Sequence, residues 1–199
     1  MTRSRWTWAA IGAMALVGTT GLAAEVETLP EVVVTALRSE TTLAEVPGTV
    51  HVVDHDALRQ DAPRTTPDAL RGLPSVMVQK TAYGQGSPFL RGFTGFRTLM
   101  MVDGIRLNNS AFRDGPNQYW NTVDPWSVDR YEVVMGPASV LYGSDAVGGA
   151  VNALTLAPPA WTGAPTYERT LAYRGATADE STQARAGVRG HRERALRPA

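Results

Sequence analysis

The sequence feature that most constrains the fold is a glycine-rich run over Tyr131–Asn152, YEVVMGPASVLYGSDAVGGAVN. Gly136-Pro137 predicts a turn into a helix start, and Gly143 is suited to end that helix. Gly148-Gly149 predicts a close approach of two backbone segments, where a Cβ atom would clash. The run therefore predicts a strand, a turn, a one-turn helix and a second strand within 22 residues.

Glycine-rich turns also occur in phosphate-binding loops. No Gly-Lys-Ser or Gly-Lys-Thr follows the glycines here, which argues against a P-loop. A dinucleotide fingerprint also fails, because no acidic residue closes a following βαβ unit. The run is better explained as a tight structural corner between strands.

Composition narrows the function classes. A chain of 199 residues has room for one domain with tails. Basic and acidic residues balance at 19 each, so charge gives no support for a nucleic-acid partner. The absence of cysteine excludes disulfides and thiolate metal sites. His51 and His55 are more simply explained as solvated side chains than as metal ligands, so we predict no metal site and no cofactor. We find no nucleophile–base arrangement and predict no enzyme.

The N-terminus has the three-part pattern of a secretory signal peptide. Arg3 and Arg5 form a basic start, residues 6–18 carry no charge, and small residues end at Ala24. The apolar stretch is shorter than the roughly 20 residues that a membrane-spanning helix needs, which disfavours an anchor. We predict a signal peptide over residues 1–24 and an extended leader over residues 25–47.

For residues 48–156 the pattern predicts an α+β domain, a small mixed sheet of four strands with short helices. Asp54 and Thr66 are expected to cap two helices. Asp103-Gly104, between two apolar runs, predicts a two-residue hairpin turn. Polar loops are expected over 81–87 and 108–121. The strand-like segments are 49–53, 76–78, 89–93, 133–134 and 150–155.

Three motifs carry a resemblance to a known family. The glycine-rich run, Leu90-Arg-Gly92 and Val102-Asp-Gly104 stand in the order and spacing typical of the plug domain of TonB-dependent outer-membrane receptors. The chain resembles that family over about residues 30–155. The resemblance implies an exported outer-membrane protein that takes part in the energised uptake of a large, scarce solute, an iron siderophore, haem or cobalamin.

The leader contains one apolar run that resembles the TonB box, the segment that these receptors present to TonB. An extended segment can add as a strand to the edge of a partner's sheet, here that of the TonB C-terminal domain. A plain edge strand of the plug is the alternative explanation. The resemblance implies TonB binding by Glu31, Val32, Val33, Val34, Thr35 and Ala36.

The resemblance also assigns roles to loops and arginines. Arg91 is expected to pair with barrel carboxylates, and the family places a second arginine where this chain has Met135. A methionine cannot form a charge-assisted pair, so either the plug–barrel contact is weaker or another residue, Arg130, substitutes. The two polar loops are expected to contact solute through Tyr83, Gln85, Asn109, Phe112, Arg113, Asn117 and Tyr119.

After residue 156 the character of the sequence changes. Residues 157–199 predict a linker and two alternating strands, 167–173 and 183–190, which the resemblance identifies as the start of a barrel, the only part expected to meet outer-membrane lipid. Two such strands would leave backbone groups unpaired in lipid, so we expect them to need more strands. A barrel-less periplasmic TonB-binding module and a non-functional gene fragment remain alternative hypotheses.

Overall fold

The computed structural model describes residues 33–34, 41–46, 48–82, 84–108, 111, 118–160, 163–177 and 180–191. Contacts divide the chain into residues 1–30 and 31–199, and all described residues belong to the second unit. The signal peptide predicted over residues 1–24 lies outside the described residues.

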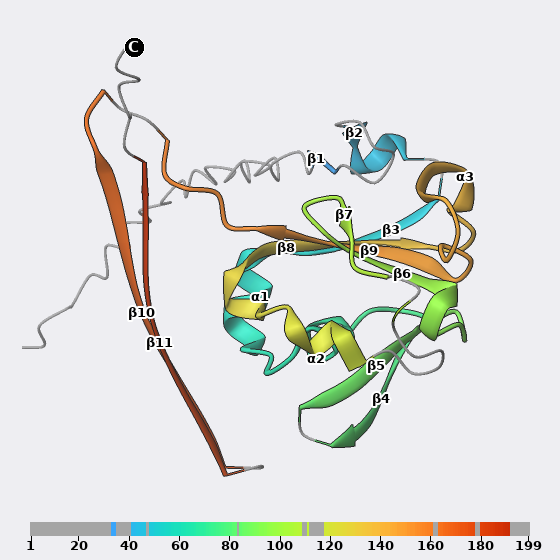
Figure 1. Ribbon diagram of the computed structural model, residues 1–199, viewed down its shortest axis with the longest axis horizontal. Helices are drawn as coiled ribbons and strands as arrows, with labels where there is room; N and C mark the ends of the chain where they lie inside the picture. The colour runs from blue at the N-terminus through green and yellow to red at the C-terminus, as the bar shows by residue number, and fades with distance from the viewer. Residues whose placement is uncertain are drawn as a thin grey trace, which may run out of the picture. The chain divides into compact units, whose positions relative to one another are not determined.

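A five-stranded mixed sheet forms the centre of the domain (Figure 1). The sheet has one strand more than the four predicted. The hairpin predicted at Asp103-Gly104 forms, and its second strand is the short edge strand of the sheet. Asp103 and Gly104 have φ of 50° and 77°, as such a turn requires. Only the pairing of β6 with β9 is parallel. In spatial order the strands are β3 (Thr49–Val53), β8 (Val128–Met135), β9 (Gly149–Thr155), β6 (Thr98–Val102) and β7 (Ile105–Arg106).

The sheet carries an apolar cluster on each face, as the alternation of side chains along a strand dictates. In β8, Tyr131, Val133 and Met135 belong to the larger cluster, while Val134 packs against the smaller one. The larger cluster has as its buried members Val53, Leu58, Leu70, Leu90, Met100, Trp120, Val128, Tyr131, Val133, Met135, Val151 and Ala153. The smaller cluster contains Leu99, Met101, Ala138, Tyr142, Ala146 and Ala150.

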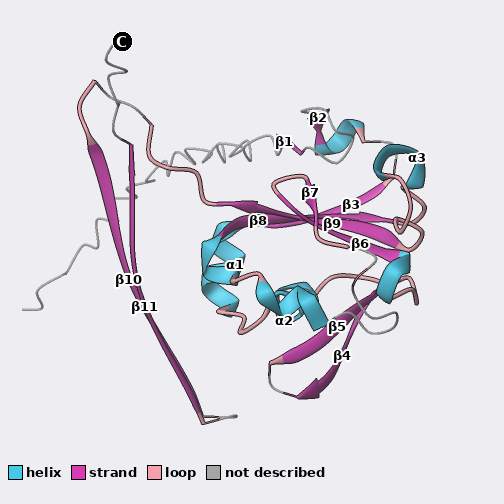
Figure 2. Cartoon of the chain, in the orientation of Figure 1, coloured by secondary structure: helices cyan, strands magenta, loops and turns pink. Residues whose placement is uncertain are grey.

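Short helices flank the sheet: α1 (His55–Asp61), α2 (Thr66–Leu70) and α3 (Ser139–Tyr142) (Figure 2). Asp54 caps α1 as predicted, since its Oδ1 accepts from the Ala57 N–H at 2.8 Å. The predicted cap of α2 was one residue too late, because Thr65 holds the cap position and Thr66 is buried inside the helix. The chain also forms the 3-10 turns η1 (Leu43–Glu45), η2 (Gly95–Arg97), η3 (Gln118–Thr122) and η4 (Pro125–Ser127).

A separate hairpin, β4 (Val76–Ala82) with β5 (Gln85–Leu90), replaces much of the loop predicted over 81–87. The strand predicted over 89–93 ends earlier, at Leu90. It ends there because Arg91 and Gly92 have φ of 51° and 85°, which turn the chain out of the extended conformation.

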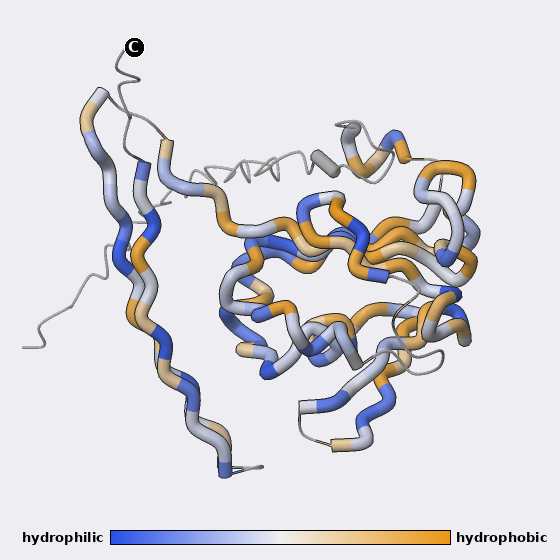
Figure 3. Tube along the Cα trace, in the orientation of Figure 1, coloured by the Kyte–Doolittle hydropathy of each residue, from blue (hydrophilic) through white to orange (hydrophobic). Residues whose placement is uncertain are grey.

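The C-terminal described segment is a second hairpin, β10 (Thr166–Ala176) with β11 (Ser181–His191). Both strands are longer than predicted and pair antiparallel over all of their residues. More and less exposed positions alternate along most of both strands, and hydropathy alternates along the middle of β11 (Figure 3). Among the described residues, no helix is long and apolar enough to cross a membrane.

Candidate functional site

The glycine-rich run is the place where all three sequence motifs meet. Arg91, from the Leu-Arg-Gly motif, lies over Gly136, so a Cβ built on that glycine would be 2.7 Å from Arg91 Nη1. Gly136 also has a φ of 99°, which favours glycine. Arg91 Nη2 donates to Thr49 Oγ1 at 3.4 Å, which connects the turn to the first strand of the sheet. Arg91 therefore lies in the turn that follows β5 and is not part of the strand.

Gly148 and Gly149 make the close approach that the sequence predicts. A Cβ on Gly148 would be 2.4 Å from the Cβ of Phe93 and 2.9 Å from the carbonyl oxygen of Leu90. On Gly149 it would be 2.5 Å from the carbonyl oxygen of Val134. These distances are shorter than a real Cβ atom tolerates. Only glycine at positions 148 and 149 therefore allows the segment around Leu90 and Phe93 to pack this closely against the start of β9.

The Asp-Gly hairpin joins the same junction through Arg106, which sequence reasoning missed. Arg106 donates from Nη2 to the carbonyl oxygen of Tyr142 at 3.1 Å and to that of Ser144. Its Nη1 lies 3.6 Å from Asp145 Oδ2. The arginine thus meets backbone carbonyls at the C-terminal end of α3, a location that favours a cation. No local pattern in the sequence indicated these contacts, because they span 36 positions or more.

Asp103 ties that hairpin to the end of β9. Its Oδ1 accepts from the Thr155 N–H and its Oδ2 from Thr155 Oγ1, both at 2.8 Å. From the other side, Gly104 N–H donates to Asn152 Oδ1 at 3.0 Å. The turn residues predicted for their φ preference therefore also fix the point where the chain leaves the central sheet.

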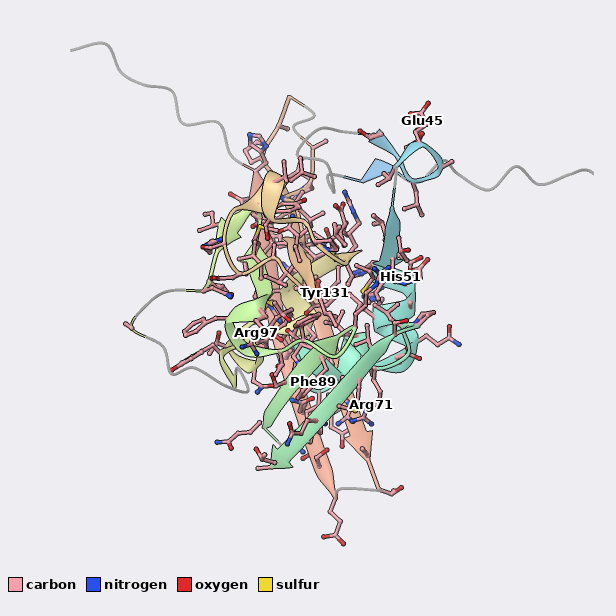
Figure 4. All side chains as sticks on the ribbon, turned by 90° about the vertical axis from the view of Figure 1, so that its right-hand side faces the viewer. Glu45, His51, Arg71, Phe89, Arg97 and Tyr131 are labelled. Atoms are coloured by element: carbon pink, nitrogen blue, oxygen red, sulfur yellow. The ribbon has the colours of Figure 1, made fainter. Side chains whose placement is uncertain are left out.

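A buried hydrogen-bond chain links β8 to α2 and to the segment before η4. Thr66 Oγ1 donates to the Val123 carbonyl oxygen at 3.0 Å, so the Tyr131 hydroxyl, also 3.0 Å away, must donate to Thr66. Burial raises the pKa of Tyr131 to about 12; the bond to Thr66 opposes this shift and the Asp124 carboxylate adds to it. Figure 4 shows Tyr131 in the middle of the packed side chains.

Arg130 and Met135 are both engaged within the domain. Arg130 donates from Nε to Glu132 Oε1 at 3.0 Å, and its Nη2 lies 3.0 Å from the same oxygen. The Glu132 side chain is 1% exposed, so the pair is buried on its acidic side. Met135 is buried in the larger apolar cluster, where the thioether fills space. The position at which the resemblance implies an arginine is therefore an apolar core position in this chain.

The described parts of the two predicted solute loops come together where Asn121 meets Gly86, at one side of the β4–β5 hairpin. Asn121 Nδ2, in η3, donates to the carbonyl oxygen of Gly86 in β5 at 3.4 Å, and Trp120 is buried beneath it. Gln85 is exposed and its Oε1 accepts from Thr81 Oγ1, whereas Tyr119 is half-buried. The other candidates lie outside the described residues: Tyr83, Asn109, Phe112, Arg113 and Asn117.

The described part of the leader forms a small sheet of its own. Strand β1 (Val33–Val34) pairs antiparallel with β2 (Thr41–Thr42), in the register Val33 opposite Thr42. These valines are extended, as their β-branched side chains predict, and β1 is not a strand of the central sheet. The remaining residues of the predicted TonB-binding run, Glu31, Val32, Thr35 and Ala36, lie outside the described residues.

No metal centre is visible in the described segments, where His, Asp and Glu form no group of three close enough to hold an ion. The junction holds distant segments of the domain together. Its polar groups are paired with one another across long sequence separations.

Comparison with known proteins decides the family. The family model described as the TonB-dependent receptor plug domain matches residues 42–150. The chain belongs to the TonB-dependent receptor plug family. The match includes Leu90-Arg-Gly92, Val102-Asp-Gly104 and the glycine-rich run up to residue 150.

Curated relatives agree with that assignment. The chain is 36% identical over 136 residues to the vitamin B12 transporter BtuB of Vibrio vulnificus, covering 67% of this chain and 22% of the relative. It is 35% identical over 128 residues to an iron-regulated outer membrane virulence protein of Vibrio cholerae, covering 62% and 19%. The chain therefore spans about a fifth of the length of these relatives.

A solved structure shows the same fold. The pyoverdine outer membrane receptor FpvA from Pseudomonas aeruginosa, bound to pyoverdine, matches with a TM-score of 0.53 and 25% identity over 69% of this chain and 18% of that one. The similar proteins are transporters and receptors, which confirms that the chain is not an enzyme. The plug resemblance is confirmed, and the chain is an exported protein of the outer membrane.

Proposed function

We propose that this chain carries the plug of an outer-membrane receptor that takes up a large, scarce solute with energy delivered through TonB. The observation that carries the proposal is the junction where Arg91, Arg106 and Gly104 converge on the glycine-rich run. It supports a plug because the chain belongs to that family over residues 42–150. Cobalamin, an iron siderophore and haem are the candidate solutes, the first two matching the relatives' names.

The proposed solute surface is the side of the β4–β5 hairpin where η3 packs. Asn121 holds η3 to the backbone of β5, which puts Tyr119 and Gln85 on neighbouring elements. Aromatic and amide groups from two loops suit a bulky chelate or macrocycle, which offers both apolar area and hydrogen-bond acceptors. Tyr83, Asn109, Phe112, Arg113 and Asn117 stay in the proposed set on sequence grounds.

A chimera tests the solute. Residues 42–150 of this chain would replace the matching plug in the BtuB relative, and cobalamin-dependent growth would be measured. We expect growth, and we expect Gln85→Ala with Tyr119→Ala to reduce cobalamin uptake while leaving the amount of chimera in the outer membrane unchanged. A chimera that reaches the membrane but supports only siderophore-dependent iron uptake would contradict cobalamin as the solute.

The proposed TonB-binding segment is Glu31–Ala36. The extended pair Val33–Val34 supports it, because a strand that pairs only with β2 among the described residues can exchange that partner for the sheet edge of the TonB C-terminal domain. A pull-down with that domain tests it. Val33→Pro should abolish capture, since proline removes a ladder N–H, while Val46→Pro, near the far end of the leader, should not. Equal capture of both variants would refute the assignment.

The proposed domain limits are a signal peptide over 1–24, a leader over 25–47, a plug over 48–156, and a linker with the first barrel strands over 157–199. The β10–β11 hairpin supports the last of these. Each strand has eleven residues, close to the roughly 9–11 that a tilted membrane strand needs. One face of the hairpin is largely apolar and the other polar, the alternation expected of a barrel wall.

A further inference from the structure

Helix α2 contacts both parts of the proposed solute surface, the β4–β5 hairpin and η3 (Figure 1). Three consecutive residues of this short helix each meet a different segment. Thr66 bonds to the residue that follows η3, and Asp68 pairs with Lys80 of β4. Pro67 packs against β5, since a Cβ built on Gly86 would lie 3.4 Å from Pro67 Cβ. One turn of helix therefore supports the surface at three points.

Thr66 fixes the end of η3. Its Oγ1 donates to the carbonyl oxygen of Val123, the first residue after η3, at 3.0 Å. Thr66 is fully buried and its hydroxyl has one proton, which this bond uses. The Tyr131 hydroxyl donates to the same threonine oxygen from β8 and so orients the threonine towards Val123. Without the Thr66 hydroxyl, the Val123 carbonyl would lose its donor and the end of η3 would lose this polar link to α2.

Asp68 fixes the β4–β5 hairpin. Its Oδ1 lies 2.5 Å from Lys80 Nζ, and the Asp68 side chain is 13% exposed. The carboxylate is also held within its own segment, because Oδ2 accepts from Thr65 Oγ1 at 2.8 Å. Lys80 stands directly opposite Gly86 in the hairpin, and the Gly86 carbonyl accepts from Asn121 of η3. The ion pair therefore anchors the hairpin beside the point where it meets η3.

We infer that α2 is the positioning element of the solute surface: Thr66 holds η3 and Asp68 holds the hairpin, so that Tyr119 and Gln85 are presented at a fixed separation. Thr66 and Asp68 act through these contacts and do not themselves meet the solute. A surface held in its bound geometry binds more tightly, because less conformational entropy is lost on binding. The inference rests on the proposed function for the solute, whereas the two anchors can be tested without it.

Hydrogen exchange of the full chain, measured by mass spectrometry, tests the two anchors separately. Thr66→Val keeps the shape and removes the hydroxyl, so it should speed exchange of the η3 peptide severalfold and leave the β4 peptide unchanged. Asp68→Asn should do the reverse. Thr66→Ser should restore the parent rate in η3. Val53→Ala, in the same apolar cluster but on β3, is the control for a general loss of stability and should affect both peptides alike.

Lysine chemistry gives a second measurement of the Asp68 anchor, because Lys80 is the only lysine in the sequence. Acetylation of its amine by an N-hydroxysuccinimide ester should be severalfold faster in Asp68→Asn than in the parent and unchanged in Thr66→Val. Equal responses of both peptides to both variants, or parent rates throughout, would overturn the positioning role. If Thr66→Val does not fold because the Tyr131 hydroxyl is left buried without an acceptor, Thr66→Val with Tyr131→Phe takes its place with the same expected outcomes.

Cobalamin uptake by the BtuB chimera connects the anchors to the solute. Thr66→Val and Asp68→Asn should each raise the cobalamin concentration for half-maximal uptake severalfold, at an unchanged amount of chimera in the outer membrane, and Thr66→Ser should restore it. Parent uptake in both variants, where exchange has shown loosened elements, would overturn the role in solute binding. A parent chimera that takes up no cobalamin would refute cobalamin as the solute, while the exchange pattern still decides whether α2 positions η3 and the hairpin.

Discussion

The glycine-rich junction and the β10–β11 hairpin are both paired strands that contain glycine, but they are specified in different ways. At the junction, single atoms decide the structure, because Gly149 leaves no room for a methyl group beside the Val134 carbonyl oxygen. In the hairpin, Gly187 has nothing within 4 Å of its Cβ position, and a repeating two-residue pattern specifies the strands. Single substitutions should therefore act strongly in the first region and weakly in the second.

The largest difference should come from one alanine in each region. Gly149→Ala puts a methyl group 2.5 Å from the carbonyl oxygen of Val134 and 2.9 Å from Leu90 Cδ1. We expect the free energy of unfolding to fall by roughly 3 kcal/mol, since a packed backbone cannot move away cheaply. Gly187→Ala should change it by less than about 0.5 kcal/mol. Urea unfolding followed by tryptophan fluorescence measures both, and equal effects would break the comparison.

Removal of a cation from a buried pair should rank second. Arg130→Met leaves the Glu132 carboxylate, 1% exposed, without its arginine. We expect a loss of about 2 kcal/mol in the free energy of unfolding, because a buried charge without its partner costs more than the pair gained. Adding Glu132→Gln should recover part of this loss. A wild-type unfolding midpoint for Arg130→Met would show that the pair contributes nothing to the plug.

Tyr131→Phe should have a smaller effect at neutral pH and a distinctive one in alkali. The loss of its bond to Thr66 should cost about 1 kcal/mol at pH 7. In the folded protein the pKa of Tyr131 is about 12, above the usual value of 10. The contribution of Tyr131 to the free energy of unfolding is therefore complete below pH 10 and is lost as the pH rises towards 12.

The alkaline behaviour is checked by unfolding midpoints from pH 9 upward, a range set by the Tyr131 shift. Tyr131→Phe should flatten the decline, whereas Tyr173→Phe, 72% exposed in the hairpin, should leave it unchanged. A decline of equal steepness in Tyr131→Phe would mean that other groups cause the alkaline loss.

Local signals in the sequence predicted much of the fold. The strand Thr49–Val53, the Asp54 cap, the Asp103-Gly104 turn and the one-turn helix ending at Gly143 all follow from backbone preferences of the residues themselves. The close approach at Gly148 was also predictable, because only glycine suits such a contact. These features need no knowledge of distant parts of the chain.

Features that depend on distant partners were missed or misplaced. Threonine is a residue type that often caps helices, which is why Thr66 was predicted as a cap. In the structure its hydroxyl is instead buried and forms hydrogen bonds with the distant Tyr131 and Val123. Arg106 contacts Tyr142 across 36 positions, which no local pattern encodes. The strand predicted through residue 93 failed because the left-handed conformation of Arg91 is imposed by the junction rather than favoured by arginine.

The smallest effect should come from a pair with the same chemistry as Arg130 and Glu132. Arg189 Nη2 lies 2.8 Å from Glu168 Oε1 on directly opposed positions of β11 and β10. The Glu168 side chain is 51% exposed, so water replaces most of what the arginine supplies. Arg189→Met should therefore destabilise the hairpin by about 0.5 kcal/mol, and by less in concentrated salt.

Hydrogen exchange of the β10 amides, with and without salt, measures this effect, and Arg189→Lys serves as the charge-conserving control. A loss from Arg189→Met as large as that from Arg130→Met would mean that burial does not separate the two regions. A small, salt-sensitive loss would instead show that an arginine–glutamate pair stabilises the fold strongly where it is buried, at Arg130 and Glu132. The exposed pair of the hairpin would then add little to the stability that the strand pairing already provides.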